Sequence, residues 1–434
     1  MKRLEELEGT QWWPLEKILA LQDERLRKLI RYAYDNVPYY HRVFEQHALK
    51  PEDIKGSGDL AKLPILTKQL IRGNFNDLIA HNFPRKELMA CHTGGSTGEP
   101  FRFYKTRDDY HGWDTAAGLR AYKWAGYKVG DRLALFWGRH PRESIMDGIA
   151  RTARHFLERV ELFDALELSE EKMPLFTKRL KGFQGAFIKG FPTAIYLVAR
   201  FIEKEGRPKI RPKAIITTGE ELYDFQRALF SKVFGCETYS YYGANEVDAI
   251  ASECSEHTGY HISVENMIVE IVDDEGKLVP AGQEGRIVVT SLHNYGMPFI
   301  RYDMGDVGVR SDKVCPCGRG LPLLATINGR VSDFIFTRSG GCIPGVALNW
   351  AFFANLGIEQ FQIIQESYEK VVVKIVLAKG YHQEHVNEVV QRIEKQFKSE
   401  LGEDMDIVIG IVDQIPPTRI GKRRLVISHV SKSL

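Results

Sequence analysis

The sequence predicts an α/β fold in which helices cover a sheet, followed by a smaller α+β domain. Two observations support this fold class. Between residues 130 and 245, short apolar runs alternate with segments of helical periodicity, the order expected of strands connected by helices. From residue 268 the pattern changes to hairpins, and beyond residue 329 a separate strand-rich unit begins. We therefore expect a large N-terminal domain over residues 1–330 and a small C-terminal domain over residues 331–434.

The N-terminal segment has the pattern of a helix. Its apolar residues recur at helical spacing, at Leu15, Ile18, Leu19, Leu26, Leu29, Ile30 and Ala33. Val37-Pro38 ends this run, because the residue before a proline disfavours helical backbone. A second helix-rich stretch continues to about Asp77 and is interrupted at Pro64.

The next region supplies the strands of the expected sheet. They are expected at Leu133–Trp137, Ala186–Lys189, Ala214–Thr217 and Thr238–Tyr241, with helices at Thr193–Glu203 and Glu221–Phe234. A hairpin is expected from Ile268–Val272 and Gly285–Ser291, joined through the turn at residues 273–276. In the small domain we expect strands at Phe334–Thr337, Phe361–Gln365, Val371–Leu377 and Ile407–Val412, and a helix at His385–Leu401.

Composition excludes several classes of protein. The 434 residues include 59 basic and 57 acidic side chains, so the formal charge is only +2 and a nucleic-acid partner is not expected. No apolar run reaches about 18 residues, so we expect no membrane insertion. The N-terminus has no apolar signal core, and six cysteines in so long a chain do not indicate a disulfide framework. A reduced, cytoplasmic location is expected, and the oligomeric state is left open, with a homodimer as one alternative.

One octapeptide, Thr93–Pro100 (TGGSTGEP), has the composition of a phosphate-binding loop. Its glycines let the backbone turn sharply and approach a ligand, while its amides and hydroxyls can donate to one anion. It is not a Walker loop, since no lysine follows the second glycine. Taken alone, a flexible connector is an equally good interpretation.

Five further motifs follow in order. Residues 217–220 (TTGE) and 241–246 (YYGANE) each follow an expected strand, where α/β sheets commonly bind ligands. Then come residues 302–306 (YDMGD), 329–333 (GRVSD) and 421–424 (GKRR). Singly, each has an ordinary alternative: Asp306 as a turn residue, Glu246 as a surface carboxylate and Lys422 as part of a solvated basic patch.

Together these motifs resemble the core motifs of the adenylate-forming enzymes, the superfamily of acyl-CoA synthetases, adenylation domains and luciferases. The resemblance extends from Thr93 to Lys422, about three quarters of the chain. The short length, the sequence TGEEL at residues 218–222 and CPCGR at residues 315–319 are most similar to the phenylacetate–CoA ligase and capsular-polysaccharide (CapK-type) branch.

The resemblance implies a two-step reaction. A small carboxylic acid would first attack the α-phosphate of ATP to give an acyl-adenylate, and the acyl group would then pass to an acceptor, in most relatives coenzyme A. It also implies Mg²⁺ on Glu246, a ribose contact at Asp306, support from Arg330 and a mobile catalytic lysine at Lys422. The remaining implied ATP contacts are Thr93, Gly94, Gly95, Ser96, Thr97, Gly98, Thr218, Gly219, Glu220, Tyr241, Tyr242 and Gly243.

The acid and the acceptor are less well defined by the sequence. Aromatic residues favour an aryl or arylalkyl acid, with an expected pocket of Phe136, Phe191, Tyr242, Gly243 and Ala244, although aromatic residues are more often core. The alternative acceptors are an amine or a hydroxyl, as in polysaccharide or natural-product tailoring. A third hypothesis, an inactive nucleotide-binding scaffold, is disfavoured because a scaffold has no use for Glu246, Asp306, Arg330 and Lys422 together.

Three positions depart from the common pattern of the superfamily. Phe101 stands just after the loop, where many relatives place a lysine. Asn245 occupies a position that is commonly threonine, and Ser332, followed by Asp333, occupies the interdomain hinge. The residue at Phe101 implies that one phosphate contact of the relatives is missing, and the hinge residues leave open how the small domain rotates and whether a CoA step is used.

Three of the six cysteines suggest a structural zinc site. Thiolates and imidazoles are the preferred ligands of Zn²⁺, and a closed tetrad is typical of a structural site. We expect Cys254, His261, Cys315 and Cys317 as the ligands, with His257 as a substitute for His261. The alternative is that these cysteines are buried, reduced thiols that pack as small apolar groups.

Overall fold

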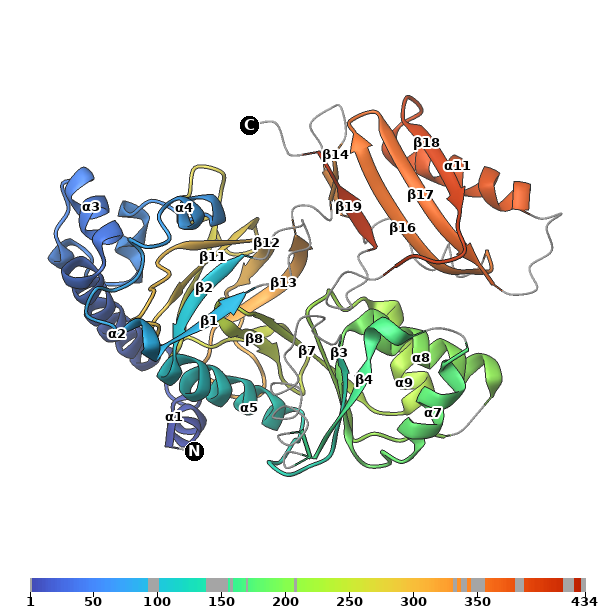
Figure 1. Ribbon diagram of the computed structural model, residues 1–434, viewed down its shortest axis with the longest axis horizontal. Coiled ribbons are helices and arrows are strands. Elements are labelled where there is room, and N and C mark those ends of the chain that lie inside the picture. The colour runs from blue at the N-terminus through green and yellow to red at the C-terminus, as the bar shows by residue number, and fades with distance from the viewer. Residues whose placement is uncertain are drawn as a thin grey trace.

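The computed structural model describes residues 2–92, 101–137, 155–156, 159–168, 171–206, 209–330, 334–336, 342–344, 356–378, 386–416 and 425–430. Its main feature is an 11-stranded mixed sheet with the strand order β10-β11-β12-β13-β9-β8-β7-β6-β5-β3-β4 (Figure 1). The first half of this sheet in chain order is parallel and comprises β3 (Leu133–Trp137), β4 (Val160–Asp164), β5 (Phe187–Gly190), β6 (Ala214–Thr218) and β7 (Glu237–Ala244). The α/β class expected from the alternation of strands and helices is confirmed.

The other half of the sheet is antiparallel. It comprises β8 (Asp248–Glu253), β9 (Tyr260–Ile262), β10 (Met267–Val272), β11 (Glu284–Ser291), β12 (Tyr302–Ser311) and β13 (Leu323–Arg330). A separate hairpin of β1 (Leu88–His92) and β2 (Arg102–Thr106) pairs His92 with Arg102, so these two strands flank the expected phosphate loop.

Helices cover both faces of the parallel half. α7 (Met173–Lys181), α8 (Pro192–Glu205) and α9 (Asp224–Phe234) pack on one face, and α1 (Lys2–Thr10) and α5 (Thr115–Trp124) pack on the other (Figure 1). Successive residues of a strand point to opposite faces. On β5, Phe187 accordingly lies in the core under α1 and α5, whereas Ile188 lies in the core under the other three helices.

The N-terminal helices pack on the antiparallel half of the sheet. The large core there joins α2 (Leu15–Asn36) and α3 (Pro38–Gln46) to strands β8–β12. α4 (Lys68–Gly73) follows, after η1 (Pro51–Asp53) and η2 (Ser57–Lys62). Further along the chain are η3 (Arg85–Glu87), the π-helical η4 (Asp109–Asp114) and η5 (Ala165–Glu167). Among the described residues, no helix combines the length and apolar character that crossing a membrane requires.

The C-terminal part contains a smaller sheet with the order β18-β17-β16-β19. Its strands are β16 (Ile358–Ser367), β17 (Lys370–Leu377), β18 (Asp406–Ile411) and β19 (Val426–Ser428), and a two-stranded hairpin joins β14 (Phe334–Phe336) to β15 (Cys342–Pro344). α11 (Val386–Leu401) buries Val389, Ile393, Phe397 and Leu401 against this sheet. The spacing of four residues places these side chains on one face of the helix.

Candidate functional site

A buried carboxylate, Glu246, lies at the centre of the candidate site. It follows β7, and its side chain is only 5% exposed. The Tyr302 hydroxyl donates to Oε1 of Glu246 over 2.9 Å, and Nζ of Lys68 lies 3.6 Å from the same oxygen. A buried carboxylate can bind a phosphate-bound Mg²⁺, and the adjacent cation can pair with the phosphate. Surface exposure, the ordinary alternative for Glu246, does not hold in the structure.

The backbone holds Lys68 in this position. Leu66 forms a bridge with the start of β12, in which its amide donates to the Arg301 carbonyl over 2.8 Å and its carbonyl accepts from Asp303 over 3.0 Å. The Thr67 hydroxyl then accepts from the Leu70 amide, which starts α4 at Lys68. Sequence reasoning missed Lys68, because a lysine opening a short helix has no distinctive signal. The absence of a lysine after the phosphate loop was the one indication that a cation had to come from elsewhere.

Asp306 lies near this centre, on β12. The Tyr242 hydroxyl donates to Oδ2 of Asp306 over 2.7 Å, which joins the motif after β7 to the motif on β12. The backbone of Arg330 on β13 is directly opposite Asp306 in the register of the two strands. Three motifs, two of which lie 64 residues apart along the chain (Tyr242 and Asp306), thus lie together in the structure.

The motif after β6 contributes a positioning contact. Thr218 is buried, and Gly219 has φ +81°, a conformation that favours glycine. Glu220 accepts hydrogen bonds from the Thr193 amide (3.1 Å) and hydroxyl (2.6 Å), so its carboxylate caps the N-terminus of α8. Because a carboxylate at a helix N-terminus is stabilised by the free amides there, Glu220 has a clear structural role. Its expected role at the adenine stays a prediction.

Several expected site residues lie outside the described residues. They are Thr93, Gly94, Gly95, Ser96, Thr97 and Gly98 of the phosphate loop, the catalytic lysine Lys422, and Ser332 and Asp333 of the hinge. One described contact reaches the base of the loop: the Asn245 amide donates to the carbonyl of His92 over 3.2 Å. This asparagine, at a position that is commonly threonine, therefore connects the Glu246 motif to the residue just before the loop.

The expected aromatic pocket is divided by the structure. Phe136 and Phe191 are 1% and 0% exposed, and both pack in the core under α7, α8 and α9. Phe136 stacks on Phe163 and Phe191 stacks on Trp137, with ring centroids 4.9 and 4.3 Å apart. The core role that sequence analysis kept as the alternative therefore describes these two side chains. Tyr242, Gly243 and Ala244 lie beside Asp306 and Glu246 instead.

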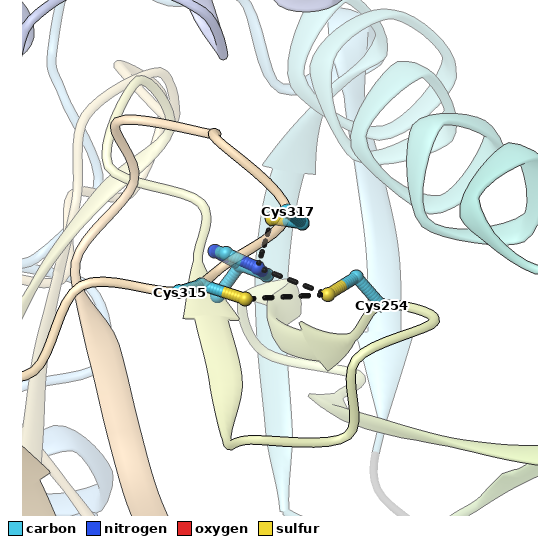
Figure 2. A group of neighbouring side chains, drawn as sticks. Cys254, Cys315 and Cys317 are labelled. Atoms are coloured by element: carbon cyan, nitrogen blue, oxygen red, sulfur yellow. Dashed lines mark hydrogen bonds between the residues drawn. The ribbon is translucent and has the colours of Figure 1, made fainter.

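The four expected metal ligands come together in one cluster. One ligand atom from each of Cys254, His261, Cys315 and Cys317 lies within 4.8 Å of all the others. Cys254 Sγ is 3.6 Å from Cys315 Sγ, and His261 Nε2 is 3.4 Å from Cys254 Sγ and 3.3 Å from Cys317 Sγ. Figure 2 shows the thiols pointing toward one another around the imidazole ring. Tetrahedral Zn²⁺ with bonds of about 2.0–2.3 Å separates its ligands by roughly 3.3–3.8 Å, so this donor set fits the ion.

Burial and hydrogen bonds shift the pKa values of the side chains in this cluster. Burial lowers the pKa of His261 to about 4, so the imidazole is neutral at pH 7, as a metal ligand must be. It raises the pKa of Cys254 to about 12. Burial also acts to raise the pKa of Cys317, but hydrogen bonds from Arg319, Cys315 and Cys254 together outweigh it and lower that pKa below its ordinary value.

His257, the expected substitute ligand, has other contacts. It adopts φ +48° in the turn between Cys254 and β9. Its Nδ1 lies 3.4 Å from Oε2 of Glu253, and its Nε2 lies 3.4 Å from Oε2 of Glu237. His261 on β9, which is fully buried, is therefore the histidine of the cluster.

Comparisons with known proteins show which proteins this chain is similar to. Residues 335–429 match the family model described as the CapK C-terminal domain. The chain is 24% identical to a phenylacetate-coenzyme A ligase of Thermus thermophilus, over 95% of this chain and 97% of that protein. It is 23% identical to Protein CapK of Staphylococcus aureus, over 95% and 90% of the two chains. The crystal structure of 2-hydroxyisobutyryl-CoA ligase in the postadenylation state, in complex with R3-HIB-AMP, matches with a TM-score of 0.77 at 20% identity, covering 96% of this chain and 91% of that one. The expected resemblance and the adenylate-forming fold are confirmed.

Proposed function

We propose that this chain, a relative of the phenylacetate-coenzyme A ligases and CapK with the adenylate-forming fold, is an AMP-forming acid–CoA ligase. It would activate a carboxylic acid with ATP as an acyl-adenylate and then transfer the acyl group to the thiol of coenzyme A. The observation that carries the proposal is the convergence of Glu246, Asp306 and Lys68 through the hydroxyls of Tyr302 and Tyr242.

In the first step, charge develops on the phosphates of ATP, and fixed opposite charges are the usual source of catalysis. The Asp306 carboxylate would accept from the ribose hydroxyls, which orients the nucleotide. Glu246 would hold Mg²⁺, and the ion when bound would neutralise phosphate charge. Lys68, already beside Glu246, would supply the ammonium that the phosphate loop lacks at Phe101.

The second domain completes the proposal. We assign residues 1–330 to the nucleotide- and acid-binding domain and residues 331–434 to a mobile domain that brings Lys422 to the acyl carboxylate. Among the described residues, the two parts meet at an ion pair between Lys204 on α8 and Glu359 on β16, at 3.8 Å, and where Val307 on β12 packs against Tyr368 and Val430. Lys204 is more than half exposed, and such surface pairs contribute little, about 0–1 kcal/mol, so the ion pair would not prevent rotation.

Zinc belongs to the proposal as a structural ion. Cys254, His261, Cys315 and Cys317 would fill all four tetrahedral positions, which leaves no position for substrate. The ion would join the turn before β9 to the segment before β13. Its function would be to hold these two segments together beside the sheet.

The alternative acceptor is an amine or a hydroxyl. The match of residues 335–429 to the CapK C-terminal domain and the similarity to Protein CapK favour keeping it, because these relatives, unlike the phenylacetate-coenzyme A ligases, are not named for a CoA reaction. Both versions share the first step and differ only in the molecule that attacks the acyl-adenylate.

ATP–pyrophosphate exchange tests the shared first step. Purified protein is given ATP, Mg²⁺ and one member of a panel of carboxylic acids that includes phenylacetate and short aliphatic acids. Acid-dependent exchange supports the proposal, and ATP binding without exchange for any acid would overturn it. Release of AMP on adding CoA, compared with amines and alcohols, then identifies the acceptor. A Lys422→Ala variant should lose exchange yet still convert a supplied acyl-adenylate to the thioester.

A further inference from the structure

The ammonium group of Lys189 is partly buried on the face of the large sheet that α1 and α5 cover. Lys189 is the third residue of β5, where it is flanked by Leu135 of β3 and Ile216 of β6 in the strand register. Like Phe187 two residues earlier, it points to the face covered by α1 and α5. The core on that face consists of apolar and aromatic side chains, so a lysine beside it departs from the pattern of a buried parallel strand.

The described contacts of Lys189 are all with tyrosines. Its Nζ donates to the hydroxyl of Tyr122 on α5, and it lies 4.5 Å from the Tyr122 ring centroid and 5.7 Å from that of Tyr241. In the part of the chain that the structure describes, no carboxylate lies within ion-pair distance of Lys189. An ammonium group has three donors, and partial burial without an anion is unfavourable.

Two hydroxyls point to the same place as the ammonium group. A Cβ atom added to Gly118 on α5 would lie 3.6 Å from the Tyr241 hydroxyl and 4.0 Å from the Tyr122 hydroxyl. Gly118 thus leaves the helix surface bare where both hydroxyls approach it. The result is a cluster of three polar groups, Lys189, Tyr122 and Tyr241, which we call the Lys189 cluster.

The Lys189 cluster lies close to the candidate site. Lys189 is one residue from the carboxyl end of β5, the edge of a parallel sheet at which ligands bind. Tyr241 directly precedes Tyr242, whose hydroxyl donates to Asp306, so the two side chains leave the end of β7 on opposite faces. An acid that crosses the end of β7, with its carboxylate facing the nucleotide, would therefore extend its far end toward these three groups.

We propose that the Lys189 cluster determines substrate specificity by binding a second acceptor group, a carboxylate or a hydroxyl, at the far end of the acid. This inference rests on the proposed function and narrows its substrate class. An anionic tail would pair with the ammonium group, and the tyrosine hydroxyls would complete its hydrogen bonds. An unsubstituted apolar tail would remove water from the ammonium group without supplying an anion. Sites with a buried polar group discriminate strongly against substrates that lack its partner.

The test compares acids that differ only in the tail. Exchange is measured with phenylacetate, 4-hydroxyphenylacetate and 4-carboxyphenylacetate, and with butyrate and glutarate. The intact protein should show kcat/KM at least about tenfold higher for the acid with a second acceptor in each set. The variant Lys189→Met, similar in length but neutral, should remove or reverse this preference while exchange with the unsubstituted acids is kept or increased. The group that gives the higher kcat/KM, carboxylate or hydroxyl, identifies the chemical class of the far end of the natural acid.

Controls separate specificity from a structural role. Lys213→Met changes a lysine just before β6 that pairs with Asp131 at 2.9 Å, and it should leave the preference unchanged. An equal loss for all acids in Lys189→Met, or no preference in the intact protein, would overturn the inference while exchange itself upholds the proposed function. If no acid supports exchange, the proposed function fails. Calorimetric binding of the same acids to the intact protein and to Lys189→Met then still decides the role of the cluster.

Discussion

The hydroxyl of Tyr302 donates a 2.9 Å hydrogen bond to the carboxylate of Glu246, a residue 56 positions earlier in the chain. The hydrogen bond fixes the orientation of the buried Glu246 side chain, and Nζ of Lys68 lies 3.6 Å from the same carboxylate oxygen. A carboxylate held in this way does not have to reorganise when a cation and phosphates arrive, which is the basis of electrostatic preorganisation.

Replacing Glu246 tests its role as the Mg²⁺ ligand. Glu246→Gln should lower the rate of ATP–pyrophosphate exchange by about 10²–10³-fold, because a fixed charge is lost at the phosphates. It should also raise the Mg²⁺ concentration needed for half-maximal rate. Tyr302→Phe removes one hydrogen bond and should cost only about 1 kcal/mol, roughly fivefold in rate. Exchange within twofold of the intact protein in Glu246→Gln would rule out this role.

Lys68 should contribute to ATP turnover although it lies outside the recognised motifs. Lys68→Met is expected to lower kcat/KM for ATP by about 10–100-fold, the scale of one charge-assisted contact to phosphate. Lys68→Arg should recover part of this loss. The control is Lys62→Met, which changes a lysine paired with Asp59 on the surface at 2.7 Å. Equal effects of the two methionine variants would contradict a specific role for Lys68.

The metal cluster should bind one zinc ion for each chain. Cys315→Ser should reduce the zinc content measured by elemental analysis to well below half an equivalent, and it should lower the melting temperature. Cys236→Ser is the matched control, because Cys236 is a half-buried free cysteine outside the cluster. Because we propose a structural role for the ion, the folded fraction of Cys315→Ser should keep its acid preference. If the purified intact protein contained no zinc and had the same melting temperature as Cys315→Ser, the assignment would be contradicted.

His293 should make the fold sensitive to acid. Its ring stacks on Trp113 with centroids 3.9 Å apart, and burial, with Arg25 nearby, lowers its pKa to about 3. The unfolded chain, with an ordinary pKa of about 6.5, binds a proton that the folded chain excludes. The free energy of unfolding should therefore fall as the pH decreases from about 6.5 toward 3, by at most about 1.4 kcal/mol per pH unit from this group.

The variant His293→Phe keeps the stack but cannot titrate. Urea unfolding at pH 7, 6 and 5 should show a shallower pH dependence in this variant than in the intact protein. His47→Gln, at an exposed histidine, should leave the slope unchanged. Parallel pH profiles for His293→Phe and the intact protein would show that His293 is not the group responsible.

Features that depend on neighbours along the chain were accessible from the sequence. The strand expected at Ala186–Lys189 from a short apolar run corresponds to β5, and the helices expected at Thr193–Glu203 and His385–Leu401 correspond to α8 and α11. The order of the motifs around Glu246 and Asp306 sufficed for the superfamily. α1 was not predicted, because its nine residues contain only two buried leucines, too few to show a period.

Contacts between distant segments were decided only by the tertiary structure. Lys68 reaches Glu246 because Leu66 bridges to β12, and no local pattern encodes that pairing. The choice of His261 over His257 depends on β9 directing His261 into the cluster, and the burial of Phe136 depends on which face of β3 the helices cover. The apolar periodicity was sufficient to predict the α/β class, and the ordered motifs were sufficient to predict which chemical groups are available to the site. Which side chains meet was decided by the packing of strands and helices, since burial and long-range hydrogen bonds act only once those elements are assembled.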